Sequence, residues 1–237
     1  MSTGPSESPA ALRACWHPVA YAADVARAPC ATLLLGEPLV LWRDAADAVH
    51  AFRDVCVHRG TALSLGCVEG DELVCAYHGW RYRGDGACTA IPQLAEPTRV
   101  PARARAVAYP AQERYGIVWA ALEPPPRPLP EVPELDDPAW RAVRTGPFAW
   151  ACDASRQVEN FTDFCLGYCV VARNYNLEQP DDVIQAFERT IFGQDQRVVE
   201  SQRPDRVPFD VAAELHLTFD AVAVAYRRAM RAHGFGS

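Results

Sequence analysis

Two short stretches carry the most information in this chain: Cys56-Val57-His58-Arg59-Gly60 and Cys75-Ala76-Tyr77-His78-Gly79-Trp80. Their cysteines and histidines form the pattern C-x-H-x16-C-x2-H. The first pair follows a strand-like run, and the second is followed by a glycine, at which the backbone can turn tightly. We therefore expect each Cys/His pair in a loop of its own, where the two loops together hold a metal centre.

The mixed pairs fit a Rieske-type 2Fe-2S cluster, in which two thiolates hold one iron and two imidazoles hold the other. The predicted ligands are Cys56, His58, Cys75 and His78. A structural zinc site is the main alternative, because two Cys and two His also satisfy tetrahedral zinc. Zinc fingers group like ligands with like, whereas each pair here is mixed. The spacing therefore favours the cluster over zinc, and over a chance gathering of buried residues.

At these residues the chain resembles the Rieske non-haem iron oxygenases, specifically their large, catalytic (alpha or terminal oxygenase) subunits. Respiratory Rieske proteins differ, because they carry an extra disulfide-bonded cysteine in each ligand loop, and here Tyr77 precedes His78. The resemblance covers most of the chain unevenly. Its further matching stretches are Arg81-Tyr82, Gly84-Asp85-Gly86, Tyr115-Gly116-Ile117-Val118-Trp119, Gln194-Asp195, Val198-Val199-Glu200-Ser201-Gln202 and Tyr226-Arg227-Arg228.

The resemblance implies a function and partners. In this family the cluster passes electrons to a mononuclear Fe(II), which activates oxygen to hydroxylate or demethylate a small organic, apolar or aromatic substrate. We expect a separate ferredoxin, flavin reductase or both as electron donor, because the chain has no G-x-G-x-x-G fingerprint after a strand. We also expect a homotrimer or another ring of subunits, which a heterologous interface produces.

Composition and charge favour a cytoplasmic enzyme. The net charge of −7 argues against nucleic acid or an anionic membrane as a partner. No apolar run approaches the ~20 residues of a membrane span, and the N-terminus lacks the basic start of a signal peptide. We expect the seven cysteines outside the ligand loops to be reduced core residues. They are Cys15, Cys30, Cys67, Cys88, Cys152, Cys165 and Cys169.

The sequence predicts an α+β fold with two domains. The proline-rich run 123–133 cannot continue a sheet and favours extended geometry, so it predicts a linker. We expect an all-β first domain, a small antiparallel sandwich or barrel, because short strand-like runs alternate with turns. The resemblance implies a helix-grip-like α+β second domain that is shortened here. The expected parts are a flexible N-terminus (1–9), a Rieske 2Fe-2S domain (10–122), the linker (123–134) and a catalytic-type domain (135–237).

Local patterns predict particular elements. Residues 39–42 and 48–52 flank a polar turn, which is typical of a hairpin. In the second domain, periodicity and end signals predict two helices and two strands. The helices are expected at 154–164 and 221–233, and the strands at 165–175 and 197–202.

The oxygen-activating site of the family needs two histidines and one carboxylate on one face of an iron. The resemblance places its first part in N-x-x-D-x-x-H-x4-H on a helix. This chain supplies Asn160 and Asp163, but Leu166 and Val171 occupy the histidine positions, and residues 79–215 contain no histidine. Two of the three expected ligands are therefore missing.

Two aspartates keep candidate roles from the resemblance. Asp163 corresponds to the aspartate that bridges a Rieske histidine of one subunit to an iron-ligand histidine of the next, giving electrons a short path. Asp195 precedes Val198-Val199-Glu200, as the third iron ligand precedes a strand-like run in relatives, although an ordinary solvated loop carboxylate fits it equally.

The missing histidines leave two interpretations. Residues 165–175 resemble a late strand of the catalytic domain, so Phe164 joins Cys165 where relatives have a long antiparallel sheet. Either the sequence omits residues that the protein contains, which we favour, or a deletion removed both ligands. In the second case the chain is a non-catalytic electron-transfer or accessory subunit. An intact mass well above 26.1 kDa would support the first interpretation.

Overall fold

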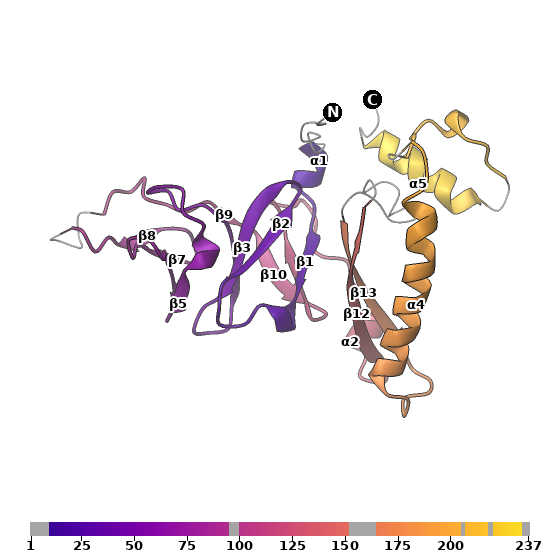
Figure 1. Cartoon of the computed structure of the whole chain (residues 1–237), viewed down its shortest axis with the longest axis horizontal. Helices are drawn as coiled ribbons and strands as arrows, with labels where there is room; N and C mark the ends of the chain where they lie inside the picture. Colours follow the sequence, from indigo (N-terminus) through magenta and orange to yellow (C-terminus); the bar gives the residue numbers. More distant parts are fainter. Residues whose placement is uncertain (1–9, 95–99, 152–164, 205–206, 218–219, 234–237) are drawn as a thin grey trace. The chain divides into compact units, whose positions relative to one another are not determined.

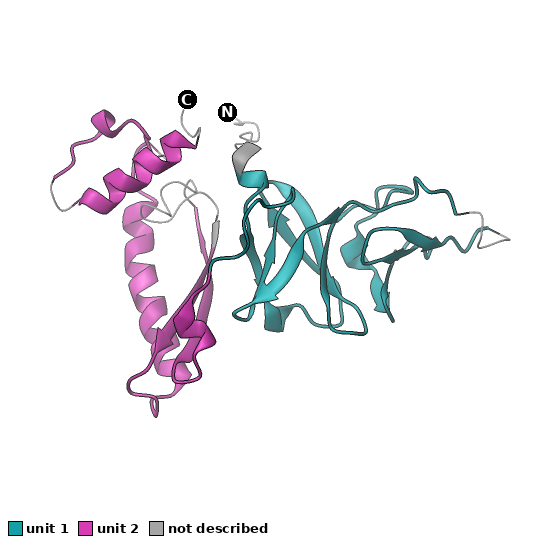
Figure 2. Ribbon diagram, turned by 180° about the vertical axis from the view of Figure 1, so that it is seen from behind, with its two compact units in different colours: residues 1–130 teal, residues 131–237 magenta. Residues whose placement is uncertain are grey.

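The computed structural model describes residues 10–94, 100–151, 165–204, 207–217 and 220–233. The chain forms two compact units, with a boundary between Pro130 and Glu131 (Figures 1 and 2). This boundary lies within the proline-rich run. Within the described ranges, no helix is long and apolar enough to cross a membrane.

Unit 1 (residues 1–130) is built from antiparallel strands, which confirms the all-β prediction for this part of the chain. The strands are β1 (His17–Tyr21), β2 (Cys30–Leu34), β3 (Glu37–Arg43), β4 (Val49–Arg53), β5 (Cys67–Glu69), β6 (Glu72–Val74), β7 (Arg81–Arg83), β8 (Cys88–Ala90), β9 (Ala108–Tyr109), β10 (Ala111–Arg114) and β11 (Ile117–Ala120). They form sheets of order β1-β11-β10, β2-β3-β4-β9 and β5-β6-β7-β8. Short helical turns are α1 (Ala10–Arg13), η1 (Ala22–Asp24) and η2 (Leu63–Leu65).

Strand β3 separates two hydrophobic cores. Leu39 and Leu41 belong to one core, with residues of β1 and β11, whereas Val40 and Trp42 belong to the other. Side chains alternate across a strand, so a strand buried on both faces reads as a continuous apolar run. We call the second cluster the loop core. It comprises Val40, Trp42, Phe52, Cys56, Leu63, Leu73, Cys75, Tyr82, Cys88, Ile91, Ala104 and Ala106.

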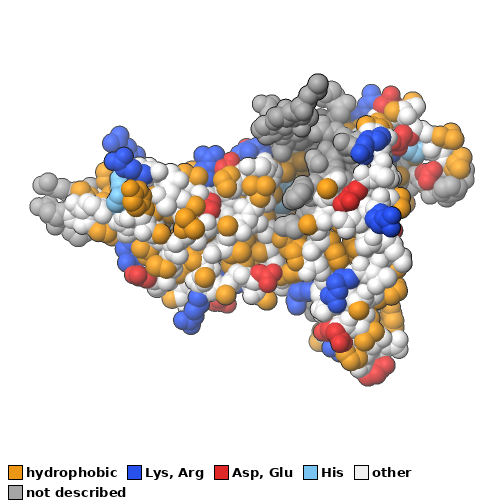
Figure 3. All heavy atoms as spheres, in the orientation of Figure 1, with side chains coloured by type: hydrophobic (Ala, Val, Ile, Leu, Met, Phe, Trp, Pro, Cys, Tyr) orange, Lys and Arg blue, Asp and Glu red, His pale blue; other side chains and the backbone are white. Residues whose placement is uncertain are grey.

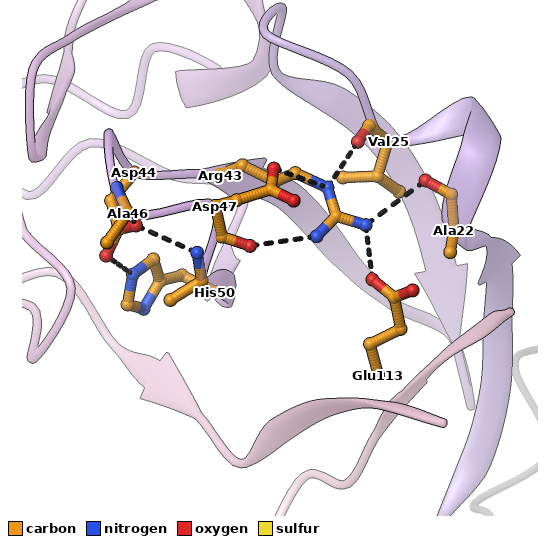
Figure 4. Close-up of polar contacts among 9 residues, drawn as sticks. Ala22, Val25, Arg43, Asp44, Ala46, Asp47, His50 and Glu113 are labelled. Carbon is orange, nitrogen blue, oxygen red and sulfur yellow. Dashed lines mark hydrogen bonds and ion pairs between the residues drawn. The ribbon is translucent and has the colours of Figure 1, made fainter. Parts of the chain in front are cut away.

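The hairpin predicted around the polar turn is confirmed as the β3–β4 pair. One carboxylate oxygen of Asp44 accepts the backbone N–H groups of Ala46 (3.0 Å) and Ala48 (2.9 Å) and closes the turn. Its other oxygen lies 2.9 Å from Nε2 of His50 (Figure 4), a contact that lowers the pKa of Asp44. The His50 ring also packs on Trp42, with ring centroids 4.4 Å apart. Side-chain capping thus fixes the hairpin at its turn.

Arg43 ties the end of β3 to three other segments. Its guanidinium donates to the carbonyl oxygens of Ala22 (3.2 Å), Val25 (2.7 Å) and Asp47 (3.0 Å), and to the carboxylate of Glu113 (2.6 Å) on β10 (Figure 4). The Arg43 side chain is only 11% exposed. These bonds therefore satisfy a charge that is largely withdrawn from water.

Unit 2 (residues 131–237) packs a long helix on a two-stranded sheet, which completes the predicted α+β fold. The aromatic rings of Phe148 and Phe192 stack at 4.2 Å beside the buried side chains of Trp150 and Val199. This contact joins the helix to the sheet. The strands are β12 (Arg141–Trp150) and β13 (Cys165–Arg173), and the helical elements are α2 (Pro133–Asp136), α4 (Asp181–Val199), η4 (Val211–Ala213) and α5 (Ala221–Ala232).

The structure confirms some of the helices and strands predicted for the second domain and contradicts one of them. Strand β13 and helix α5 confirm the predictions at 165–175 and 221–233. The strand predicted at 197–202 is wrong, because α4 continues to Val199. Val199 follows Phe192 by two turns and joins the same buried face, so helical spacing overrides the β propensity of the valines. The helix predicted at 154–164 lies outside the described residues.

The cysteines outside the ligand loops form no disulfide wherever the structure describes their side chains. The expectation that they all belong to the core is wrong. Cys88 is buried, Cys30 and Cys169 are half-buried, and Cys15 and Cys67 are exposed. Cys67 begins β5, an edge strand of its sheet, where one side meets solvent.

Substitution of Gly84 tests how firmly the hairpin is held. A Cβ at Gly84 would lie 2.3 Å from the His50 ring, which its contacts with Asp44 and Trp42 hold in place. We expect Gly84→Ala to lower the free energy of unfolding by about 1–3 kcal/mol, measured by urea denaturation. Gly193→Ala is the control, because its Cβ meets nothing within 4 Å and alanine stabilises a helix. Equal stability of the two variants would contradict this packing.

Candidate metal centre

Two tight loops of unit 1 present the four residues of the Cys/His motif. The first loop follows β4, and the N–H of Gly60 donates to the carbonyl of Cys56 (2.8 Å). The second joins β6 to β7, and the N–H of Gly79 donates to the carbonyl of Cys75 (3.0 Å). Gly60 and Gly79 have φ angles of +73° and +69°, which favour glycine. The structure thus gives each Cys/His pair its own loop, as the motif predicts.

Cys56 and Cys75 lie together in the loop core, and each is only 2% exposed. The hydroxyl of Tyr82, itself fully buried, lies 3.1 Å from Sγ of Cys56. Desolvation and the neighbouring Cys56 thiol raise the pKa of Cys75, and desolvation raises the pKa of Tyr82. The Tyr82 hydroxyl therefore remains a donor. Burial opposes ionisation of the Cys75 thiol, whereas a bound metal ion favours the thiolate.

The two histidines lie together and are half-buried. The rings of His58 and His78 meet edge to face, with centroids 4.5 Å apart, and Trp80 stacks on His58 at 4.6 Å and 7°. Desolvation, His78 and Arg59 lower the pKa of His58. Its Nδ1 is buried and has no hydrogen-bond partner among the described residues. A neutral imidazole with an unpartnered buried nitrogen is the state that binds metals.

This donor set fits a 2Fe-2S cluster. Two adjacent thiols and two adjacent imidazoles supply a pair of ligands for each of two irons. Among the described residues, no three His, Cys, Asp or Glu side chains are placed to hold one metal ion together. Tetrahedral zinc needs four donors around a single ion. The paired arrangement therefore fits the cluster, in which each iron takes two donors from the protein.

The loop tips reach the surface of unit 1. Val57 and Tyr77 are exposed hydrophobic side chains, and Arg59 is exposed beside them. Figure 3 shows histidine among basic and hydrophobic side chains at the end of unit 1 that carries β7 and β8. The imidazole half of the centre therefore lies nearer the surface than the thiol half.

The described residues do not assemble a second iron site. Asp195, expected in a loop before a strand, lies exposed within α4, because the helix extends through the Val198-Val199 pair. Leu166 and Val171 lie on β13, in register with Ala149 and Val143 of β12. Asp163 lies outside the described residues. The two positions at which the family has iron-binding histidines are therefore occupied here by strand residues that cannot bind a metal.

Sequence reasoning missed two residues that shape the centre. Tyr82 could have been found, because it lies two positions after Trp80, and alternation along a strand places both on one face. Gln93 accepts from the indole of Trp80 (3.2 Å) and donates to the carbonyl of His78 (2.8 Å). No local pattern marks Gln93, since its partners lie across a turn and two strands.

Comparisons with known proteins agree with this geometry. Residues 15–110 match a family model described as the Rieske [2Fe-2S] domain, and residues 159–233 match the vanillate O-demethylase oxygenase C-terminal domain. Methylxanthine N1-demethylase NdmA of Pseudomonas putida is 38% identical over 161 residues, which cover 65% of this chain and 45% of NdmA. A solved structure of NdmA from Pseudomonas putida CBB5 superposes with a TM-score of 0.80 and 26% identity, over 93% of this chain and 90% of that one.

Two further known proteins are similar to shorter parts of this chain. Oxidoreductase NdmD of Pseudomonas putida is 39% identical over 113 residues, 47% of this chain and 19% of NdmD. Dicamba monooxygenase, solved with non-haem iron and dicamba, superposes with a TM-score of 0.58 and 29% identity, over 63% of this chain and 46% of that one. The chain spans less than half the length of these curated relatives.

Proposed function

We propose, from the premise that this chain belongs to the Rieske-type oxygenases as an alpha-type subunit, that Cys56, His58, Cys75 and His78 hold a 2Fe-2S cluster which accepts electrons singly. The observation that carries the proposal is the meeting of two buried thiols with two half-buried imidazoles. The cluster supplies one-electron transfer at a potential raised by its imidazole ligands.

Each residue of the centre has a task in this proposal. Cys56 and Cys75 anchor the cluster where the loop core excludes water. The Tyr82 hydroxyl donates to the Cys56 sulfur and stabilises negative charge there. His58 and His78 bind on the side that a partner can approach.

We propose that the whole protein is the terminal oxygenase component of a cytoplasmic multicomponent system. It hydroxylates or demethylates a small organic, apolar or aromatic substrate, and it takes electrons from a separate ferredoxin or flavin reductase. The C-terminal family match and the demethylase NdmA support this class of reaction, and NdmD is named an oxidoreductase. A ring of subunits, such as a homotrimer, would let Asp163 bridge a cluster histidine of one chain to the iron site of the next.

The residues of this sequence do not fit the mononuclear iron. Leu166 and Val171 lack metal-binding atoms, and Asp195 alone cannot supply a facial two-histidine, one-carboxylate site. No step of oxygen activation is therefore assigned to these residues. If Phe164 is joined directly to Cys165 in the protein, this mismatch favours a second candidate function, that of an electron-transfer or accessory subunit.

Spectroscopy and iron content test the cluster assignment. Reduced protein should give the electron paramagnetic resonance (EPR) spectrum of a Rieske centre, with two irons and two acid-labile sulfides from the cluster. Cys75→Ser or His78→Ala should abolish or severely perturb this spectrum. Cys67→Ser, at an exposed thiol outside both loops, is the matched control and should leave it unchanged. A colourless protein that holds one zinc would contradict the assignment.

Tyr82→Phe should lower the midpoint potential of the cluster. The hydroxyl stabilises the more negative, reduced state by donating to the Cys56 sulfur. A hydrogen bond of about 1–1.5 kcal/mol corresponds to roughly 40–60 mV for one electron. Protein-film voltammetry measures this shift, and Tyr109→Phe on β9 provides a control. A potential equal to that of the wild type would show that this bond does not tune the centre.

Iron content distinguishes the two candidate functions. A chain of 26.1 kDa should contain only the cluster irons and show no oxygen uptake that depends on vanillate or a methylxanthine. If the purified protein has a larger mass and a third iron, Asp195→Ala should remove that iron and spare the cluster. Asp182→Ala, an exposed position on the same helix, should retain it. Full oxygenase activity at 26.1 kDa would refute the ligand argument.

A further inference from the structure

We propose that Gln93 is a positioning residue that holds both histidines of the centre, His58 through the indole of Trp80 and His78 through its backbone carbonyl. This role rests on the proposed function, because it presumes that the Cys/His motif holds the cluster.

The side-chain amide of Gln93 has one orientation that satisfies both partners. The indole Nε1 of Trp80 is only a donor, and it lies 3.2 Å from Oε1 of Gln93. The carbonyl of His78 is only an acceptor, and it lies 2.8 Å from Nε2 of Gln93. A flipped amide would oppose donor to donor and acceptor to acceptor. The amide is therefore a directional link between the two loop residues.

The turn that carries Gln93 is fixed on both sides. The N–H of Leu94 donates to the carbonyl of Ile91 (2.9 Å), and Ile91 is buried in the loop core. Pro92 lies against the second ligand loop, since a Cβ added at Gly79 would come within 3.2 Å of its ring. The backbone of this turn thus holds the side-chain amide of Gln93 next to the second ligand loop.

The link reaches both imidazoles. Trp80 lies parallel to His58 at 4.6 Å, and the His58 and His78 rings are 4.5 Å apart. Rotation of the indole would remove the face on which His58 rests. Gln93 itself is exposed, so burial does not account for its position, and its two polar contacts do. Partners of this kind orient metal ligands, and their loss commonly weakens metal binding 10–100-fold.

Gln93→Met tests the role, because methionine keeps the length of the side chain and removes both hydrogen bonds. We expect shifted EPR g-values in the reduced protein and roughly 10-fold faster loss of iron to a chelator. The control is Gln112→Met on β10, the same exchange in a sheet that lacks the ligand loops. Circular dichroism should show that both variants fold as the wild type does.

The Trp80→Phe background separates positioning from general loosening. Phenylalanine keeps an aromatic face but has no N–H for Gln93, so Gln93→Met should shift the g-values less in this background than in the wild type. Unchanged g-values and iron loss in Gln93→Met, or equal shifts in both backgrounds, would overturn the role while leaving the cluster assignment intact. A wild-type protein without a Rieske spectrum would overturn the proposed function, and this role with it.

Discussion

Burial of strand β3 on both faces is the constraint on which the rest of unit 1 depends. Leu39 and Leu41 serve one core while Val40 and Trp42 serve the other. A shift of register by one residue would exchange the two faces, so neither core can be repacked without the other. The loop core therefore has a fixed position relative to the core that β3 shares with β1 and β11. The thiols of Cys56 and Cys75 belong to that core, and their burial follows from it.

This burial sets the chemistry of the centre. Desolvation raises the pKa of the Cys75 thiol and lowers the pKa of the His58 imidazole, so burial favours the uncharged form of both side chains. Metal binding is then coupled to release of the thiol protons. The same core holds the Tyr82 hydroxyl against Cys56, where it remains protonated. A single packing arrangement thus provides ligands, insulation from water and a donor to sulfur.

Local patterns predicted the parts of the fold that local interactions determine. The Cys/His spacing, the polar turn at Asp44 and the alternation of residues 165–175 each report on neighbours in sequence, and the loops, the hairpin and β13 agree with them. The end of α4 and the Gln93 link depend on distant partners. Two valines suggested a strand, but Phe192 and Val199 both pack against residues of β12, and this packing requires helical spacing. Such choices are tertiary, and short windows of sequence do not contain them.

Helix α4 also bears on the question of whether residues are omitted between Phe164 and Cys165. It packs Phe192 and Val199 on β12, yet Val183, Phe187, Ile191 and Val198 form a second apolar stripe that is exposed. The first three recur every four residues, and Val198 follows Ile191 by seven, so all four lie on one face. A two-stranded sheet covers only one side of a helix, and a stable domain buries both apolar faces of such an element. The described two-stranded sheet therefore leaves this stripe uncovered, and the longer sheet expected if residues are omitted would be one surface able to cover it.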